Sequence, residues 1–342
     1  MLFVCCYNYS MNGSELFVKA LENEGVTHIF GVAGEENLPL LQAISKSKIE
    51  YIPTRHEQGA AFMAATWGRL TGKPGVCLST LGPGATNLVT GAAYALLGGM
   101  PMVMITGQKP IRERTQGNFQ IIDVVKMFDP IVKYTTQVTD ANMIPRIVRE
   151  AFQKAEAEKP GPTHIELPKD ISMDETIKPV IERTPVITKA ALMDKIQEGI
   201  EMIQESKSPL LMVSSAANRK NISKILTSFV DKTGIPFVST QMGKGAIDER
   251  NEHYLGTLAL SSRDYIHCAL EQADLVIAVG YDLSQKIPFS STKVKILHIN
   301  FFQEEKNPYY RLDYEIIGDV HEVFTIFTEK IEKKFEKTGV VK

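Results

Sequence analysis

The sequence has 342 residues, of which 44% are hydrophobic and 23% charged, a composition typical of a globular protein large enough for two domains. Its 38 basic and 40 acidic side chains give a net charge of −2, which provides no basic surface for nucleic acid. No apolar run is long enough to cross a bilayer, and the four cysteines have neither zinc-site nor disulfide spacing, so we expect no membrane partner and a cytoplasmic location.

Short apolar runs alternate with helical patterns along the first half of the chain, which predicts parallel strands flanked by helices. Residues 1–11 are expected to be an extension, because a natural helix start follows Met11, and the first domain is expected over residues 12–170. Its predicted strands are 26–30, 50–54, 75–80, 102–106, 131–135 and 163–167. Its predicted helices are 12–24, 36–46, 57–71, 85–97, 119–128 and 141–158.

The second half repeats this alternation after a break. Residues 171–188 lack clear periodicity and are expected to be a linker, and a Rossmann-like domain is expected over residues 189–336. Its predicted strands are 209–214, 236–240, 274–280, 294–300 and 314–318, and its predicted helices are 189–205, 219–233, 262–272 and 320–336. The predicted fold class is therefore α/β, with two doubly wound, mainly parallel sheet domains in tandem.

The stretch RHEQGAAFMAATWGR, residues 55–69, poses a question about Glu57. This carboxylate opens a helix whose following turns are small and apolar, which predicts a helix buried nearly all round. A carboxylate beside such a segment loses water and needs a partner, and nothing in the stretch supplies one. His56 precedes Glu57, but neighbours on a helix point in different directions, so we expect a structural role for this histidine.

The stretch STLGPGATN, residues 79–87, predicts a tight turn after a strand that ends at Thr80. Gly82 and Gly84 permit unusual dihedrals and close approach, while Pro83 fixes one dihedral. Ligands of open α/β sheets bind beyond the carboxyl ends of strands, so this turn could press its backbone against a flat ligand. An ordinary strand–helix turn would have the same residues, and no Gly-Lys-Ser/Thr follows to make a P-loop.

Other candidate motifs are weaker. The stretch GVAGEEN, residues 31–37, has Gly31 and Gly34 but no full dinucleotide fingerprint, which disfavours a hydride-transferring dehydrogenase; Glu35 or Glu36 would suit a helix start. The histidines lack metal-ligand spacing, so no metal site is expected among them. Ser214-Ser215 lacks the nucleophile elbow of a hydrolase.

Four stretches together resemble a known family: RHEQGAAFMA, GVCLSTLGPGATNLVTGAAYA, MVMITGQ and FQIIDVVKMFDPIVKYT. They look like the pyrimidine-binding domain of thiamine-diphosphate enzymes, and they are most similar to the acetolactate synthase (acetohydroxyacid synthase) large-subunit group. The resemblance is dense over residues 12–170 and continues more weakly over 189–335, which resemble the family's central domain. RHEQGAA and GPGATN at this separation are more specific than either motif alone.

The resemblance implies a partner for Glu57. In the family the matching glutamate hydrogen-bonds N1′ of the cofactor's aminopyrimidine, which helps the 4′-imino nitrogen take the proton from C2 of the thiazolium. The resemblance also implies a set of residues close to the cofactor: Gly34, Thr80, Gly82, Pro83, Gly84 and Asn87. Phe119 and Gln120 match a Phe-Gln pair on the substrate side; the alternative is a core phenylalanine and a helix-start glutamine.

The sequence departs from the family in its length. Family members bind the diphosphate through Mg²⁺ with a Gly-Asp-Gly…Asn motif in a third domain, and Gly318-Asp319-Val320 does not match it. We expect a fragment of a longer protein, or a separate chain that supplies the domain. The resemblance implies a homodimer or homotetramer for the complete protein, with a regulatory subunit as a further candidate partner.

A second departure concerns the flavin of authentic acetolactate synthases. Lys159 stands where the family has an arginine, and lysine does not replace that planar fork. The stretches SSAAN (214–218), GTLAL (256–260) and GYDLSQ (280–285) replace the family's flavin-contacting motifs. Lys244 could serve a nucleotide or lie in a solvated turn. FAD is therefore a doubtful cofactor, whereas thiamine diphosphate with Mg²⁺ is expected.

The function that we expect is carboligation of 2-oxo acids, most simply two pyruvates giving acetolactate and carbon dioxide. One rival is a 2-oxo-acid decarboxylase of the same superfamily, which would release acetaldehyde. Another is a nucleotide-binding or regulatory module that uses the second domain and lacks catalysis. A Gly-Asp-Gly…Asn motif encoded beyond Lys342 would favour the enzyme, and a stop codon would favour the module or a split enzyme.

Overall fold

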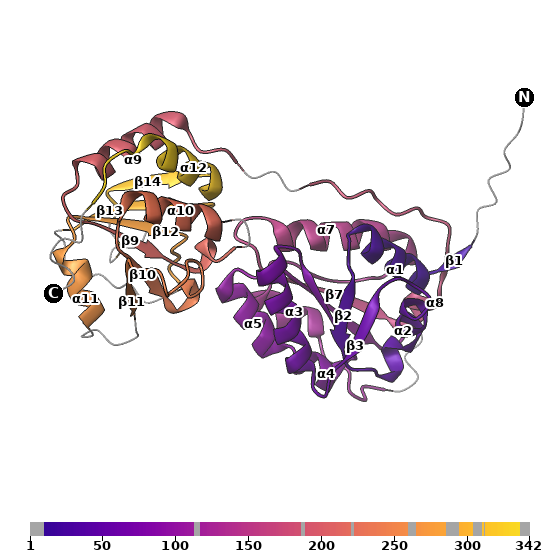
Figure 1. The fold of residues 1–342 in the computed structure, drawn as a ribbon. Helices are drawn as coiled ribbons and strands as arrows, with labels where there is room; N and C mark the ends of the chain where they lie inside the picture. Colours follow the sequence, from indigo (N-terminus) through magenta and orange to yellow (C-terminus); the bar gives the residue numbers. More distant parts are fainter. Residues whose placement is uncertain are drawn as a thin grey trace, which may run out of the picture. The chain divides into compact units, whose positions relative to one another are not determined.

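The computed structural model describes residues 10–112, 117–185, 189–219, 222–258, 265–284, 294–303, 310 and 312–335. The chain divides into two compact units, residues 1–186 and 187–342 (Figure 1). Each unit contains a six-stranded sheet in which all neighbouring strands run parallel. The predicted α/β fold class with two parallel-sheet domains is confirmed.

The first unit alternates strands with helices. Its strands are β1 (Met11–Asn12), β2 (His28–Gly31), β3 (Glu50–Pro53), β4 (Gly75–Ser79), β5 (Met102–Gln108), β6 (Thr135–Gln137), β7 (Pro162–Pro168) and β8 (Glu175–Thr176). Its α-helices are α1 (Gly13–Asn23), α2 (Leu38–Ile44), α3 (Glu57–Thr71), α4 (Gly82–Thr86), α5 (Val89–Gly98), α6 (Val124–Phe128), α7 (Ile144–Glu156) and α8 (Lys169–Met173). Short 3₁₀ turns are η1 (Glu35–Asn37), η2 (Asp129–Ile131) and η3 (Ala141–Met143).

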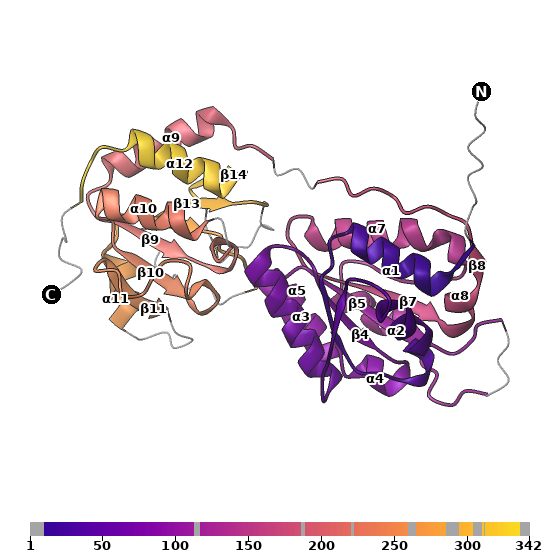
Figure 2. The ribbon, with the colours of Figure 1, turned by 45° about the vertical axis from the view of Figure 1, so that its right-hand side comes forward.

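The sheet of the first unit has the order β3-β2-β4-β5-β7-β6 and is covered on both faces. Helices α1 and α7 lie over one face, and α3 with α5 lies over the other (Figure 1, Figure 2). All residues of β4, β5 and β7 are buried, as expected for parallel strands with helices on both sides. The loops at the carboxyl ends of these strands are therefore held by a rigid, dry core.

One expectation about α3 is wrong. The helix is not buried nearly all round: Ala60, Ala61, Ala64 and Ala65 are fully buried, but Met63 and Leu70 are 42% and 67% exposed. Small side chains on the buried face let α3 approach the sheet and α5 closely, because a Cβ added at Gly91 of α5 would meet Ala61 Cβ at 2.3 Å. The outer face of α3 is apolar and open in the described chain.

The ends of the first unit pair with each other. Strand β1 forms an antiparallel pair with β8, in which Met11 lies opposite Thr176. Two observations therefore differ from the predicted boundaries: Met11 is part of a strand, and residues 169–176 form α8 and β8 in the segment predicted as the start of a linker. Residues 1–9 and 186–188 lie outside the described residues.

The second unit has the strands β9 (Pro209–Val213), β10 (Phe237–Thr240), β11 (Tyr254–Leu258), β12 (Leu275–Val279), β13 (Lys295–Asn300) and β14 (Tyr314–Ile317). Its helices are α9 (Met193–Glu205), α10 (Ser223–Thr233), α11 (Tyr265–Gln272) and α12 (Val320–Lys330), with 3₁₀ turns η4 (Ser215–Ala217) and η5 (Gln241–Gly243). The strand order β11-β10-β9-β12-β13-β14 is that of a Rossmann-type sheet. The predicted Rossmann-like character of this unit is confirmed.

Helices α9, α10 and α12 pack on one face of the second sheet, where Phe229, Phe324 and Phe327 form an aromatic cluster. Helix α11 covers the other face. No helix in the described ranges is both long and apolar enough to cross a membrane.

Candidate functional site

Three loops meet at the carboxyl edge of the first sheet. Strands β3, β2 and β4 are consecutive neighbours, and each is followed by a segment singled out in the sequence. Glu57 opens α3 after β3, Gly34 follows β2, and Thr80 with α4 follows β4. Because parallel strands present their carboxyl ends at one edge, residues far apart in the sequence are brought together there.

Glu57 is held at the first turn of α3. His56 is the N-cap: its Nδ1 accepts a hydrogen bond of 3.1 Å from the amide of Gln58, which is the structural role expected for this histidine. The Glu57 carboxylate is 8% exposed, and its Oε2 accepts a 2.9 Å hydrogen bond from Asn87 Nδ2. Asn87 is thus the protein partner of Glu57 that the sequence around residue 57 does not supply.

The other carboxylate oxygen of Glu57 lies beside Gly84. A Cβ added at Gly84 would lie 3.2 Å from Glu57 Oε1, 2.7 Å from Ser79 Oγ and 2.9 Å from Thr80 Cγ2. Oε1 accepts no hydrogen bond from any residue that the structure describes. The absence of a side chain at Gly84 therefore lets Ser79, Thr80 and the Glu57 carboxylate pack closely around it, and Oε1 keeps its acceptor capacity.

The bend between β4 and α4 needs a glycine at its first helical position. Gly82 has φ +36°, and a Cβ added there would lie 2.2 Å from the carbonyl oxygen of Gln120. Pro83 occupies the first turn of α4, where a missing N–H costs nothing, and its side chain is exposed. The predicted tight turn is therefore present, with the difference that residues 82–86 form a short helix of their own before α5.

Gly34 belongs to the same surface. The turn that contains it is tied by Asn37, whose Oδ1 accepts from the Gly34 amide at 2.9 Å and whose Nδ2 donates to Val32 O at 3.1 Å. A Cβ added at Gly34 would lie 2.7 Å from Thr80 Cβ. Thr80 thus contacts Gly34 on one side and Gly84 on the other.

Glu36 stands in the first turn of η1, the helix start that the sequence suggests, and it also belongs to a buried ion pair. It is 5% exposed, its Oε1 lies 2.6 Å from Lys109 Nζ, and its Oε2 accepts a 2.6 Å hydrogen bond from Thr80 Oγ1. Burial acts to raise the pKa of Glu36, but the hydrogen bonds from Lys109 and Thr80 outweigh burial and hold this pKa below its usual value. The hydrogen bond to Glu36 raises the pKa of Lys109. Both groups are charged at neutral pH.

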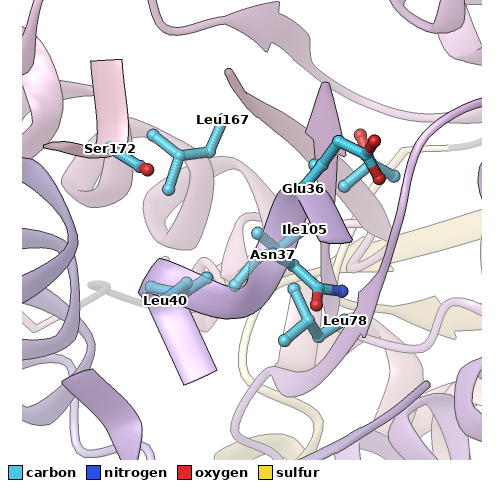
Figure 3. Close-up of a pocket in the computed structure, with 9 residues that line it drawn as sticks. Glu36, Asn37, Leu40, Leu78, Ile105, Leu167 and Ser172 are labelled. Carbon is cyan, nitrogen blue, oxygen red and sulfur yellow. The ribbon is translucent and has the colours of Figure 1, made fainter. Parts of the chain in front are cut away.

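This ion pair was missed in the sequence. A lysine directly after an apolar strand, at the same sheet edge as an acidic pair, is the signal that could have indicated it. A narrow recess lies beside Glu36 and Asn37 (Figure 3). Its lining is mostly apolar: Glu36, Asn37, Leu40, Leu78, Ile105, Thr106, Gly107, Leu167 and Ser172. The polar ends of Glu36 and Asn37 point away from Leu40, and the recess is too narrow for a small-molecule ligand.

Phe119 and Gln120 do not lie on a helix. Instead of the predicted helix 119–128, the structure has a turn at residues 117–120 and a short α6 that begins after its N-cap, Asp123. Phe119 is 66% exposed, so it is not a core residue, and Gln120 has φ +58°. The backbone of Gln120 reaches the Gly82 bend, which brings the Phe-Gln pair to the same edge as Glu57.

The residues that replace the family's flavin-contacting motifs make contacts within the protein where the structure describes them. Lys159 contributes a backbone carbonyl to Lys133 Nζ, and Ser214 Oγ lies 3.1 Å from Thr240 Oγ1 in the interior of the second unit. Lys244 lies in a solvated turn, 3.3 Å from Glu249. Residues 259, 260 and 285 of the replaced motifs lie outside the described residues.

Two buried histidines have pKa values well below that of free imidazole. Burial lowers the pKa of His164 to about 3 and that of His298 to about 4. His164 lies between Thr106 Oγ1, 2.9 Å from Nε2, and Thr135 Oγ1, 2.8 Å from Nδ1. Among the described residues, no three His, Cys, Asp or Glu side chains lie close enough together to hold a metal ion.

Comparisons with known proteins identify the family of both units. Residues 11–127 match the family model described as "Thiamine pyrophosphate enzyme, N-terminal TPP binding domain", and residues 196–326 match "Thiamine pyrophosphate enzyme, central domain". A probable acetolactate synthase large subunit of Methanococcus aeolicus is 36% identical over 323 residues, which cover 90% of this chain and 53% of that protein.

Two further relatives show the same pattern. Acetolactate synthase 2, chloroplastic, of Nicotiana tabacum is 39% identical over 307 residues, 86% of this chain and 46% of that protein. Acetolactate synthase of Bacillus subtilis is 35% identical over 315 residues, 90% of this chain and 55% of that protein. The chain thus spans about half the length of the curated relatives that it matches.

Proposed function

The chain belongs to the thiamine pyrophosphate enzyme family, of which it carries the N-terminal TPP binding domain and the central domain, and on that premise we propose that it supplies the pyrimidine side of the active site of an acetolactate synthase-like enzyme. The proposed reaction joins two pyruvates to give acetolactate and carbon dioxide. The observation that carries the proposal is the buried Glu57 carboxylate, whose Oε1 lies beside Gly84 and accepts no hydrogen bond from the residues that the structure describes.

The residues of the sheet edge fit an aminopyrimidine. Glu57 Oε1 would hold the proton at ring nitrogen N1′, while Asn87 fixes the second oxygen. Gly34, Gly82 and Gly84 let their turns pack closely against Thr80 and Gln120, and the ring would lie against the backbone of these turns, with Thr80 and Pro83 at the borders. When bound, thiamine diphosphate supplies a thiazolium that accepts the electrons released by decarboxylation of a 2-oxo acid.

Phe119 and Gln120 are proposed to face the substrate. Both lie in the turn that touches the Gly82 bend, and 66% of Phe119 is open to contact. An exposed phenyl ring at a sheet edge of this kind would exclude water from the reacting carbon once substrate and the rest of the site cover it.

We propose that the complete protein is a homodimer or a larger homo-oligomer. The outer face of α3 and α5 carries Met63, Leu70, Tyr94 and Leu97, which are 42%, 67%, 36% and 59% exposed. Phe62 and Tyr94 stack edge-on across the two helices, with ring centroids 5.2 Å apart. An apolar face of this extent, on the helix that begins with Glu57, fits a subunit interface next to the site. A regulatory subunit is a further possible partner within this proposal.

The diphosphate and Mg²⁺ ligands are proposed to come from outside these 342 residues, since the sequence has no Gly-Asp-Gly. The proposal does not extend to FAD, because Lys159 and the stretch 214–218 stand where the resemblance expects an arginine and glycines.

The first experiment combines this chain with a diphosphate-binding domain, Mg²⁺ and thiamine diphosphate, and follows the exchange of the C2 proton in D₂O by NMR. Glu57→Gln should reduce exchange about 10²–10⁴-fold, the usual contribution of a positioned acid–base group. Glu50→Gln, a 70% exposed carboxylate at the start of β3, is the matched control and should not change exchange. Near-native exchange in Glu57→Gln would contradict the proposal.

The second experiment identifies the product formed from pyruvate. Acetolactate supports the synthase, whereas acetaldehyde would indicate a decarboxylase. If the chain does not bind thiamine diphosphate in any combination, a non-catalytic module becomes the better description.

A further inference from the structure

The pair Glu36–Lys109 is a buried ion pair that the proposed chemistry does not use. The two side chains are 5% and 9% exposed, and Nζ lies 2.6 Å from Oε1. Burying two charges is costly unless each is paired and hydrogen-bonded, and in many proteins an apolar pair would serve stability as well. Stability alone therefore does not explain why these two charges are buried, and the residues that they contact indicate another role.

The second oxygen of Glu36 has one specific contact, with Thr80. Thr80 Oγ1 donates to Glu36 Oε2 at 2.6 Å, a short hydrogen bond to a charged acceptor. A threonine side chain can place its hydroxyl and methyl group in more than one staggered arrangement. A fixed carboxylate at one of these positions selects a single arrangement, and in it the methyl group Cγ2 faces Gly84.

Thr80 in turn sets the spacing of the candidate site. Its Cβ would lie 2.7 Å from a Cβ at Gly34, and its Cγ2 would lie 2.9 Å from a Cβ at Gly84. Glu57 Oε1 lies 3.2 Å from that same Gly84 position. Rotation of Thr80 would therefore change how closely the two glycine turns pack beside Glu57 Oε1.

Lys109 keeps the acceptor in place. Its amide donates to Gln108 Oε1 at 2.9 Å, and its ammonium group also lies 3.9 Å from Glu35 Oε2. Without this cation, Glu36 would be a buried, uncompensated carboxylate, and it would take up a proton or turn toward water. Either change would weaken or remove the charged acceptor of Thr80.

We propose that Glu36 and Lys109 are positioning residues, which lock the Thr80 side chain and thereby hold the Gly82–Thr86 helix and the Glu57 carboxylate in the geometry that receives an aminopyrimidine. The part that concerns the aminopyrimidine rests on the proposed function; the part that concerns the bend does not.

The test has two readouts on the full 342-residue chain. The first is hydrogen exchange of the bend, where the amides of Ala85, Asn87 and Leu88 donate to backbone carbonyls at 3.3, 3.3 and 3.1 Å. The second is the dissociation constant of thiamine, measured by saturation-transfer NMR. Thiamine lacks the diphosphate, so this probe needs no Mg²⁺ ligands.

Lys109→Met, Glu36→Gln and Thr80→Val should each speed exchange of the bend amides about tenfold, the effect of losing one hydrogen bond to a charged group, and weaken thiamine binding by a similar factor. Thr80→Ser keeps the hydroxyl and should restore both values toward those of the native chain. Lys169→Met removes a lysine that pairs with the 65% exposed Glu35 and is the matched control, with no change expected.

The outcomes separate the two claims. Unchanged exchange of the bend amides in the three variants overturns the inference, as does equal acceleration of the α7 amides, which would indicate a general loss of stability. A loosened bend with no thiamine binding by the native chain supports the positioning of the bend and counts against the proposed function. If Thr80→Ser is as defective as Thr80→Val, the hydroxyl is irrelevant and the inference fails.

Discussion

The space beside Glu57 can be tested by adding one methyl group at two glycines. Gly84→Ala introduces a Cβ that meets Ser79 Oγ at 2.7 Å, Thr80 Cγ2 at 2.9 Å and Glu57 Oε1 at 3.2 Å. Gly59→Ala introduces a Cβ two residues after Glu57, in the first turn of α3, with nothing within 4 Å. Neither glycine has a left-handed φ, so backbone strain does not enter the comparison.

The expected changes in the free energy of unfolding have opposite signs. Alanine gains about 0.5–1 kcal/mol over glycine within a helix, because it restricts the unfolded chain. At Gly59 this gain stands alone. At Gly84 overpacking of about 1–3 kcal/mol opposes it, so we expect a net loss of about 1–2 kcal/mol.

Urea unfolding followed by tryptophan fluorescence measures the first unit by itself. The only tryptophan of the chain is Trp67 in α3, and its ring lies 4.7 Å from that of His28, centroid to centroid. Thiamine titration is the second measurement, in which Gly84→Ala should abolish binding and Gly59→Ala should leave it intact. A Gly84→Ala chain that is as stable as the native chain and binds thiamine equally well would refute the conclusion that a side chain at residue 84 does not fit beside Glu57.

Two other predictions concern pH and association. Burial lowers the pKa of His164 to about 3, against about 6.5 in the unfolded chain, so the unfolded chain takes up a proton first as the pH falls. The free energy of unfolding is therefore highest above pH 6.5 and decreases as the pH drops toward 3. From pH 7 to pH 5 the first unit should lose about 2 kcal/mol by urea unfolding, and a His164→Gln chain that loses as much would refute this cause. Leu70→Glu, on the outer face of α3, should weaken self-association about tenfold in sedimentation experiments without lowering the melting temperature, since the side chain is 67% exposed. Leu192→Glu, 66% exposed outside that face, is the control, and equal weakening by both variants would argue against an interface on α3.

The parts of the fold that were predictable are those in which local chemistry and burial agree. Strand β4 and the first four residues of β5 are apolar runs. Helix α3 begins and ends at the predicted residues 57 and 71 because His56 caps it and Gly72 adopts φ +72°. Gly82 and Pro83 specify their bend by conformation alone. In these segments the backbone preference needs no information from the rest of the chain.

The helices and strands that were predicted wrongly or not at all have specific causes. Strand β11 is an edge strand of mostly half-buried residues with a glycine inside, so it lacks the apolar run of its neighbours and was not predicted. The predicted helix 119–128 shortens to α6 because Asp123 accepts from the amide of Lys126 and starts the helix there, a capping signal present in the sequence. Strand 131–135 moves to 135–137 because Pro130 belongs to a 3₁₀ turn.

Only part of the candidate site could be predicted from the sequence. The approach of Glu57 to the Gly82–Gly84 bend follows from motifs that point to one ligand, whereas its hydrogen bond to Asn87 joins residues 30 positions apart. The Glu36–Lys109 pair spans 73 positions of the chain and joins the segments that follow β2 and β5, two strands separated by β4 in the sheet. Such pairings are set by tertiary structure, which single-sequence patterns do not contain.

The antiparallel contact of β1 with β8, in which Met11 lies directly opposite Thr176, ties the start of the first unit to a segment near its end. Residues 177–185 then continue along the same unit, where Ile181 O accepts from Asn23 Nδ2 of α1 and Arg183 pairs with Glu156 of α7. A shortened chain that stops at residue 170 would therefore lose both the partner of β1 and these fastenings to α1 and α7, whereas one that stops at residue 186 would keep them.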